Sequence, residues 1–367
     1  MIIRKGQVYA VLSQLCRTID RYASISALHH VKLEADGTTL HVEATDLLSH
    51  TVATIPCDGK FAACLPAHAL AQFIKPEDAK DKHSVVELLP DGDDKVTVAC
   101  EAALTTMASL AVTDFPRRPG DKLGANEWRG AATWRVSDFA DALAWISLAV
   151  GTDETRPHLS GVQFSSEQIA GLDGHRLHLA RMPGLGSETT LLPGRSIAAL
   201  LRLLPKSGDV AALRAKDSVR FRCATGDVHW ELEAQAMTEQ FPPIENVIPT
   251  EGTETFLAEV EREALVRGIA RVGKVKDRRH VGVRIIANGA LRLERDGDDG
   301  AIASSTVPVL RTTHEGADTI IGVSAAYLAD ALACPVPVVT ARFGGQLDPI
   351  RIDLGRDRTA VVMPMRL

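Results

Sequence analysis

The sequence has few cysteines, few aromatic residues and no long uninterrupted apolar run. Its six cysteines stand singly, without a C-x-x-C motif or a paired spacing typical of zinc sites or of a disulfide framework. No window holds the roughly 18 apolar residues of a membrane span, and the amino terminus lacks the apolar segment and cleavage site of a signal peptide. These absences predict a soluble protein of the reducing cytoplasm that makes no contact with a membrane.

An excess of positive charge is also missing, because the formal net charge is -6 at pH 7. A protein that gripped nucleic acid with its whole surface would be strongly basic, so any contact with DNA must be local. The chain has 367 residues, of which 45% are hydrophobic and 24% are charged, so the composition is that of an ordinary globular protein. This length exceeds what one core usually supports, and it predicts two or three domains.

Three similar triplets divide the sequence at regular intervals. They are Val31-Lys32-Leu33, Val162-Gln163-Phe164 and Val283-Arg284-Ile285. Each triplet opens a stretch of alternating apolar and polar residues, the pattern of a half-buried β-strand, and a turn and a second such stretch follow. Self-similarity at this spacing predicts that one structural module occurs three times.

A second landmark recurs in step with the triplets: an apolar residue followed by a proline, which cannot continue a central strand. The pairs are Phe115-Pro116, Phe241-Pro242 and Met363-Pro364. Polar segments near residues 126 and 250 separate the three copies. We therefore expect three homologous domains, at residues 1–126, 127–250 and 251–367.

Each expected domain contains two windows with helical periodicity. The six windows begin near Gln7, Pro66, Val136, Gly194, Glu261 and Ser324. In the first window Val8, Leu12, Leu15 and Ile19 form one apolar stripe, the face that should pack on a sheet. Runs of strands with helices on one side predict an α+β fold with mostly antiparallel strands.

Four of the six expected helices carry a basic or polar row on one face. The rows are Ala10, Gln14, Arg17 and Arg21; His68, Gln72 and Lys75; Arg195, Ala199, Arg202 and Lys206; and Arg267, Arg271 and Lys274. The third and sixth helices carry Asp138, Asp141 and Asp330 instead. Basic residues decorate many exposed helices, but their recurrence at matched positions predicts a shared surface for the phosphates of duplex DNA. Since no base-reading motif is present, such contact would be independent of sequence.

Several blocks of the sequence resemble the beta subunit of bacterial DNA polymerase III, the sliding clamp. They are residues 156–164 (RPHLSGVQF), 172–177, 241–249 and, most specifically, 361–367 (VVMPMRL), with looser similarity at 31–46 and 114–116. The resemblance covers the whole chain. It implies a non-catalytic processivity factor of DNA replication, in which two subunits join head to tail and six domains close a ring around duplex DNA.

The resemblance also implies a groove between the second and third domains, into which the DNA polymerase III alpha subunit, the clamp loader and other proteins insert a short peptide. The matching positions are Leu159, Leu172, Gly174, His175, Arg176, Leu177, Pro242, Val247, Val361, Val362, Met363, Pro364, Met365 and Arg366. Apolar members of this set would hold the anchors of the peptide, and flexible methionines would let one pocket accept several partners. On composition alone, the block VVMPMRL also fits a last strand packed into its own domain.

The sequence departs from the family pattern at positions of both expected surfaces. Leu172 stands where a threonine is common and Asn246 where an arginine is frequent, and both changes would alter the peptide preference. Among the positions matched to DNA contacts, His68, Asp153 and Pro157-His158 replace the usual residue types. Only Arg21 keeps its type. These departures leave open a clamp-like protein that keeps the groove but has lost efficient loading onto DNA.

Three motifs that could indicate other chemistry are incomplete. Residues 268–275 (GIARVGKV) nearly spell a phosphate-binding P-loop, but the terminal hydroxyl residue is missing and the segment lies in an expected helix. Asp173 with His175, and His29 with His30, lack a third ligand or a nucleophile at informative spacing. We therefore expect no cofactor and no metal, and a hydrolase that uses Asp173 and His175 is the alternative from another functional class.

Overall fold

The computed structural model describes residues 1–20, 22–118, 128, 130–186, 188–275, 282–287, 290–298, 300–314 and 319–366. Arg21, which was predicted to contact DNA, therefore lies outside the described residues. Within them the chain forms six α-helices and 23 β-strands, and all strand pairs are antiparallel. The α+β prediction is confirmed. In this part of the chain, no helix is long and apolar enough to cross a membrane.

A strand, a helix, two to five strands, a second helix and three strands follow one another three times along the chain. The first set is β1 (Ile2–Arg4), α1 (Lys5–Leu15), β2 (His30–Thr45), β3 (Ser49–Pro66), α2 (Ala67–Phe73), β4 (Val85–Pro90), β5 (Lys95–Cys100) and β6 (Ala103–Ala108). The second is β7 (Ala132–Arg135), α3 (Val136–Ser147), β8 (Gly161–Phe164), β9 (Gln168–Leu172), β10 (Arg176–Arg181), β11 (Thr190–Pro193), α4 (Gly194–Leu203), β12 (Asp209–Arg214), β13 (Ser218–Thr225) and β14 (Val228–Gln235). The third is β15 (Phe256–Glu261), α5 (Arg262–Val272), β16 (Gly282–Ala287), β17 (Leu291–Asp296), β18 (Ile302–Val307), β19 (Val309–His314), β20 (Thr319–Ser324), α6 (Ala325–Ala331), β21 (Val338–Phe343), β22 (Ile350–Leu354) and β23 (Arg358–Val362). Each helix begins at the residue after a strand ends.

The three triplets occupy equivalent places in this order. Val31, Val162 and Val283 are each the second residue of the strand that follows the first helix of a set, namely β2, β8 and β16. All three side chains are fully buried. The strand predictions at the triplets are therefore confirmed, and all six helices begin within two residues of the expected positions.

The first helix is shorter than its apolar stripe predicts. Val8, Leu12 and Leu15 are buried as expected, but α1 ends at Leu15, so Ile19 and Arg17 lie beyond it. After Leu15 the backbone bonds tighten, because the N–H of Thr18 and its hydroxyl both donate to the carbonyl of Leu15. Such a side-chain bond to the last carbonyls competes with another helical turn.

The chain divides into two compact units. Unit 1 comprises Met1–Ala140 and Arg195–Ala236, and unit 2 comprises Asp141–Gly194 and Met237–Leu367. In unit 1, β14 pairs with β3, which joins strands of two sets in one ten-stranded sheet; in unit 2, β10 pairs with β23 in a nine-stranded sheet. A separate sheet of unit 2 has the order β18-β17-β16-β20. Because the two units share residues 127–250 between them, the domain boundaries near residues 126 and 250 stay a prediction.

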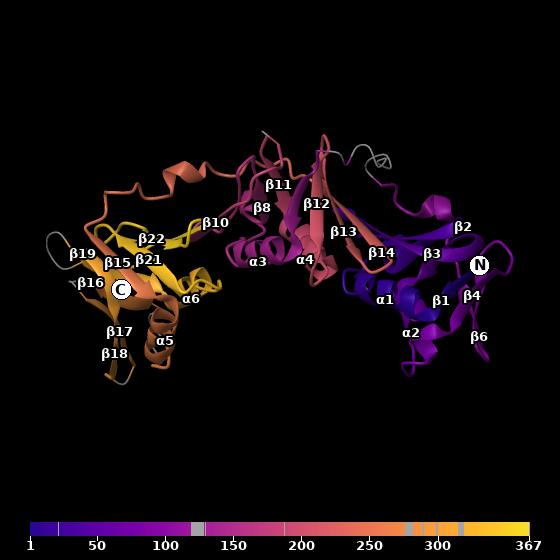
Figure 1. Cartoon of the computed structure of the whole chain (residues 1–367), viewed down its shortest axis with the longest axis horizontal. Coiled ribbons are helices and arrows are strands. Elements are labelled where there is room, and N and C mark those ends of the chain that lie inside the picture. The colour runs from indigo at the N-terminus through magenta and orange to yellow at the C-terminus, as the bar shows by residue number, and fades with distance from the viewer. Residues whose placement is uncertain are drawn as a thin grey trace. The chain divides into compact units, whose positions relative to one another are not determined.

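Helices cover one side of the strands in each unit. Figure 1 shows α1, α2 and α4 along the same side of the strands of unit 1, and α5 beside α6 in unit 2. In unit 2 the buried indole of Trp145 on α3 donates its N–H to the carbonyl oxygen of Ala331 on α6, at 3.0 Å. The ring of Trp145 also stacks on His178 of β10, with 4.3 Å between the ring centroids. Trp145 thus fixes α3, α6 and β10 relative to one another.

Candidate functional site

An apolar cluster in unit 2 brings together segments that are far apart in the sequence. Its buried members are Leu159, Ala170, Leu172, Leu177, Leu179, Ile244 and Val361, and Phe241, Val247 and Ile248 pack against them. Strand pairing explains the meeting, because β10 lies between β9 and β23 and sets Leu177 opposite both Leu172 and Val361. Five of the predicted groove residues therefore lie in one cluster: these three, Leu159 and Val247.

Sequence reasoning missed the other half of this cluster. Phe241, Ile244 and Ile248 lie in the block 241–249, and their apolar side chains could have indicated that they belong to the cluster. Ala170 and Leu179 face each other across β9 and β10, so only the pairing of these strands reveals them. The segment from Phe241 to Ile248 contains one short helical turn, Ile244–Asn246, whose Ile244 is buried.

The turn between β9 and β10 is built by Asp173 and Gly174. Gly174 has a φ of 89°, in the left-handed region that a residue with a side chain enters only with strain. The Oδ1 atom of Asp173 accepts the backbone N–H groups of His175 and Arg176, at 2.8 and 2.9 Å. Its Oδ2 accepts the Nε–H of Arg176 at 3.0 Å. Both carboxylate oxygens of Asp173 thus stabilise the turn, which is a structural role and not that of a general base.

The polar rim of the cluster is held by α6. The guanidinium of Arg176 pairs with Asp330 as well as with Asp173, and it lies over the ring of Tyr327 at 4.5 Å. The ring of His175 also stacks with the ring of Tyr327, and the two ring centroids are 6.0 Å apart. From the sequence, Asp330 was noted only as an acidic residue on the sixth expected helix, which has no basic row. Its partner lies 154 positions away, so no local signal could have identified the contact.

The carboxyl-terminal block has two structural parts. Val361 and Val362 are fully buried at the end of β23, so the interpretation of the block as a last strand holds for these two residues. Successive side chains of a strand point to opposite faces; Val361 joins the apolar cluster, and Val362 therefore faces away from it. The assignment of Val362 to the groove stays a prediction.

The remaining residues of the block leave the strand and are fixed by two backbone bonds. The N–H of Met363 donates to the carbonyl of His175, and that of Met365 donates to the carbonyl of Gly322, both at 2.8 Å. Met363 is 36% exposed, Pro364 and Met365 are half-buried, and Arg366 is exposed. The segment from Met363 to Arg366 therefore lies beside the rim, with side chains accessible to a partner.

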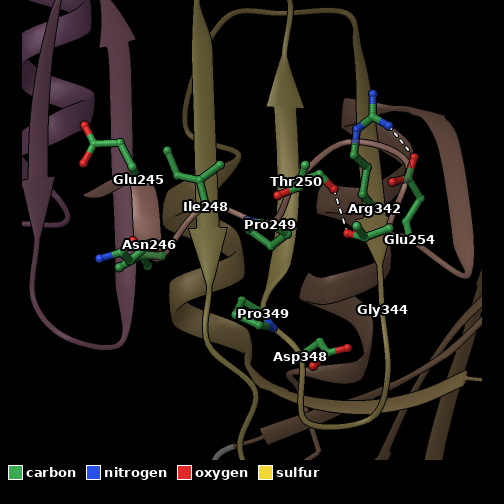
Figure 2. A pocket seen from close by; sticks show the side chains of 12 residues that line it. Glu245, Asn246, Ile248, Pro249, Thr250, Glu254, Arg342, Gly344, Asp348 and Pro349 are labelled. Atoms are coloured by element: carbon green, nitrogen blue, oxygen red, sulfur yellow. Dashed lines mark hydrogen bonds and ion pairs between the residues drawn. The ribbon is translucent and has the colours of Figure 1, made fainter. Parts of the chain in front are cut away.

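A cavity of about 390 Å³ adjoins the cluster (Figure 2). Its lining comprises Glu245, Asn246, Val247, Ile248, Pro249, Thr250, Thr253, Glu254, Arg342, Gly344, Asp348 and Pro349. Val247 and Ile248 belong to both the cavity and the apolar cluster. Arg342 pairs with Glu254 at 2.6 Å and with Asp353 at 2.8 Å. Burial alone would raise the pKa of Glu254, but backbone N–H groups and Arg342 hold it below its usual value.

The predicted basic rows are partly formed in unit 1. Arg17, Lys75, Arg195, Arg202 and Lys206 are exposed. The Nη1 of Arg202 donates to the carbonyl of Arg17 at 2.7 Å, so these two predicted DNA contacts lie side by side. Lys75 and Lys206 lie past the ends of α2 and α4, not on the helices.

One member of the α4 row is placed wrongly by the prediction. Ala199 is only 6% exposed, and the outward positions of α4 are Arg195, Ala198 and Arg202. Counted from Arg195, the residues three and seven positions later face solvent. The residue four positions later, Ala199, is turned toward the sheet. The alanine therefore packs inside and leaves the arginines exposed.

In unit 2 the basic row of α5 is exposed but partly compensated. Arg267 and Arg271 on the helix and Lys274 after it are exposed, and Arg267 pairs with Glu263 at 3.4 Å. A side chain at Gly268 would meet Leu293 at 3.0 Å, so this glycine serves the close packing of α5. The first five residues of the segment that resembles a P-loop, Gly268 to Val272, thus form the last part of a packed helix. Two of the three acidic residues that stood in place of basic rows pair with arginines: Asp141 with Arg358 at 2.8 Å, and Asp330 with Arg176.

The second histidine pair considered for chemistry also has a structural arrangement. His29 bonds the backbone carbonyl of Ala23, and His30 bonds that of Ser26 at 2.8 Å. Among the described residues, no group of three or more histidines, cysteines or acidic residues has the arrangement of a metal site. What the structure assembles is a surface with an apolar floor, a polar rim and an adjoining cavity.

Comparison with solved structures defines the fold. The DNA polymerase sliding clamp from Bacillus subtilis superposes with a TM-score of 0.87 at 18% identity, covering 100% of this chain and 98% of that one. A sliding clamp from Pseudomonas aeruginosa bound to griselimycin gives 0.85 at 20% identity, over 100% and 99% of the chains. The chain therefore has the sliding-clamp fold.

The sequence comparison is more specific. The chain resembles the bacterial beta sliding clamps: it is 24% identical over 390 residues to the one from Caulobacter vibrioides, and the similarity spans 100% of both sequences. No family model matches the chain. The resemblance drawn from the blocks of the sequence is confirmed.

Proposed function

We propose that this chain is a DNA sliding clamp, a non-catalytic processivity factor that encircles duplex DNA and tethers polymerases through the apolar cluster of unit 2. The observation that carries the proposal is the meeting of Leu159, Leu172, Leu177, Val247 and Val361 in one cluster beside an accessible carboxyl-terminal segment. We call the surface over this cluster, with its rim of His175, Arg176 and Met363, the groove. Its proposed ligands are short peptides of the DNA polymerase III alpha subunit, the clamp loader and other replication proteins of the cytoplasm.

The groove has the chemistry that a linear peptide needs. Its floor is apolar, which suits large aliphatic or aromatic anchors of a peptide. At its edge, the backbone N–H groups of Met363 and Met365 already donate hydrogen bonds to the carbonyls of His175 and Gly322. Since a solved clamp is bound to griselimycin, the same compound is a direct probe for this chain. We expect griselimycin and an alpha-subunit peptide to compete for one site. Independent binding of the two would contradict a single groove.

Two unprotected strand edges support assembly with a second copy. β6 ends the ten-stranded sheet and β18 ends the four-stranded one. Both strands have six residues and no charged side chain, and they expose Leu104 (71%) and Ile302 (69%). Proteins usually protect such edges with lysine, proline or a bulge. We propose that β6 of one subunit pairs with β18 of its partner, which closes a head-to-tail homodimer.

The dimer proposal predicts a mass near twice 39.4 kDa in light scattering at micromolar concentration. Leu104→Lys places a charge on the proposed interface and should yield monomers. Leu347→Lys is the matched control, because Leu347 is similarly exposed (66%) but lies on no strand edge. A monomeric wild-type chain, or a Leu104→Lys variant that stays dimeric, would contradict this pairing.

We further propose that the three sets of elements are three homologous domains, at residues 1–126, 127–250 and 251–367. The repeated order of strands and helices supports this division. In the assembled ring, the exposed Arg17, Arg195, Arg202, Arg267 and Arg271 would contact the phosphates of DNA. Such contacts need not be strong, because a closed ring stays on DNA by topology.

The decisive experiment is retention on DNA. After loading onto nicked circular DNA, the protein should stay bound through gel filtration, and it should slide off when that DNA is linearised. Equal retention on circular and linear DNA would refute encirclement. A chain that binds the peptide normally but fails to support processive synthesis would favour the alternative of a clamp-like protein without efficient loading. The carboxylate of Asp153, which accepts bonds from Thr155 within its own turn, is the observation in favour of that alternative.

A further inference from the structure

We propose that the cavity beside the groove is an extension of it that receives a basic side chain of the partner peptide. The inference rests on the proposed peptide-binding function and adds a selectivity that this function does not require. It has three supports: the cavity is continuous with the groove, its charge is negative, and its size and lining suit a lysine or arginine.

Continuity comes from both walls of the cavity. On one wall, Val247 and Ile248 contact the apolar cluster and also line the cavity. On the other wall, Pro349 immediately precedes β22, the strand that pairs with β23, which carries Val361 of the apolar cluster. Figure 2 shows Ile248 and Pro249 between Glu245 and the Arg342–Glu254 pair. A peptide anchored over the cluster would thus reach the cavity with its next residues.

The charge of the cavity is negative because its only arginine is fully engaged. Four charged side chains line it: Glu245, Glu254, Arg342 and Asp348. Arg342 pairs with Glu254 and also with Asp353 outside the lining, so it offers no positive charge to a ligand. Glu245 and Asp348 are exposed, and within the described part of the chain neither forms an ion pair. One oxygen of Asp348 accepts the N–H of Gly345 at 2.6 Å.

Two arginines near the groove, Arg176 and Arg351, do not reverse this sign. Arg176 forms ion pairs with Asp173 and Asp330. Arg351 forms ion pairs with Glu251 and Asp353, each at 2.8 Å. Each guanidinium therefore faces two carboxylates. Asn246, which also lines the cavity, contributes no charge. The local field attracts a cation, and charge complementarity of this kind chiefly determines the choice of partner.

The size and lining of the cavity suit a long basic side chain. Its volume of about 390 Å³ is within the usual range of ligand sites, roughly 300–1,000 Å³. Val247, Ile248 and two prolines provide apolar contact for a methylene stem, while Glu245 and Asp348 can bind the charged end. This combination fits lysine or arginine better than an acidic or purely apolar residue.

The test compares peptides that differ in one flanking residue. An alpha-subunit peptide is lengthened at either end by lysine, glutamine or glutamate, and the affinity of each for the full-length chain is measured by fluorescence polarisation. At one end, we expect lysine to bind about three- to five-fold tighter than glutamine, and glutamate to bind more weakly. The preference should shrink at 1 M salt, where the screening length falls to about 3 Å.

Matched variants assign the preference to the cavity. In the double variant Glu245→Gln with Asp348→Asn, the lysine-to-glutamine affinity ratio should fall to about one. In the control Glu167→Gln, an exposed carboxylate at the far end of β9, the ratio should stay as in the wild type. Equal binding of all extended peptides, or a preference for lysine that survives in the double variant, would overturn this inference but leave the proposed function standing. If no peptide bound the wild type, the proposed function would fail with it.

Discussion

His178 is a buried histidine directly beside the groove, and its ionisation should make the stability of unit 2 depend on pH. The side chain is 0% exposed, and its Nδ1 lies 2.8 Å from the carbonyl oxygen of Trp145. Burial lowers the pKa of His178 to about 4, with Arg176 acting in the same direction and the bond to Trp145 opposing them. The imidazole is therefore neutral at pH 7 and donates its N–H to that carbonyl.

The sign of the effect follows from where the proton binds. An unfolded histidine has a pKa of 6.5, so below this pH the unfolded chain binds a proton that folded His178 rejects until about pH 4. The stabilising contribution is complete above pH 6.5 and is lost as the pH falls toward 4. The separation between the two pKa values corresponds to about 3 kcal/mol, at about 1.4 kcal/mol for each pH unit.

The assay is urea unfolding of the wild type and of His178→Gln between pH 7 and pH 4.5. The variant should be less stable at pH 7, because it loses the stacking on Trp145, but its stability should fall less steeply with pH. His229→Gln, at an exposed histidine of unit 1, is the control and should follow the wild type. Parallel loss of stability in the wild type and His178→Gln, or an NMR titration of His178 near pH 6.5, would refute the reasoning.

Three further changes test the architecture around the groove. Gly174→Ala forces an alanine to a φ of 89° and should cost about 1–2 kcal/mol in urea unfolding; an unchanged midpoint would show that the turn relaxes. Trp145→Phe leaves the carbonyl of Ala331 without its donor, and a loss of about 1–3 kcal/mol is expected in the same assay. Asp330→Asn removes one of the two carboxylates on Arg176. Its stability should change by less than about 1 kcal/mol, and glutamate-extended peptides should bind more tightly in fluorescence polarisation. Weaker binding of those peptides would contradict the role assigned to Asp330.

The elements of the fold could be predicted because their signals are local. Alternation at Val31, Val162 and Val283 identified three buried strands, and helical periodicity located all six helices. Local patterns were less informative at element ends and faces. They extended the first helix past Leu15, and they turned Ala199 toward solvent, because competing hydrogen bonds and the neighbouring sheet decide these details.

The candidate site was predicted in composition but not in arrangement. The blocks of sequence named most groove residues, including Leu177 and Val361. They could not show that Val362 faces away, that Tyr327 and Asp330 hold the rim, or that a cavity adjoins Val247. Each of these features depends on contacts between distant segments.

The sequence by itself determined the order and type of the elements and the threefold pattern, because each is encoded by neighbours within a few positions. Its resemblance to a known family named half of the apolar cluster. The tertiary structure decided which charges cancel and which stay available. Asp141 and Arg358 are 217 positions apart, and they meet because α3 lies near the strand β23, which pairs with β10. Strand pairing at this range is set by burial of the whole sheet, so the sign of the field beside the groove was a property of the folded chain.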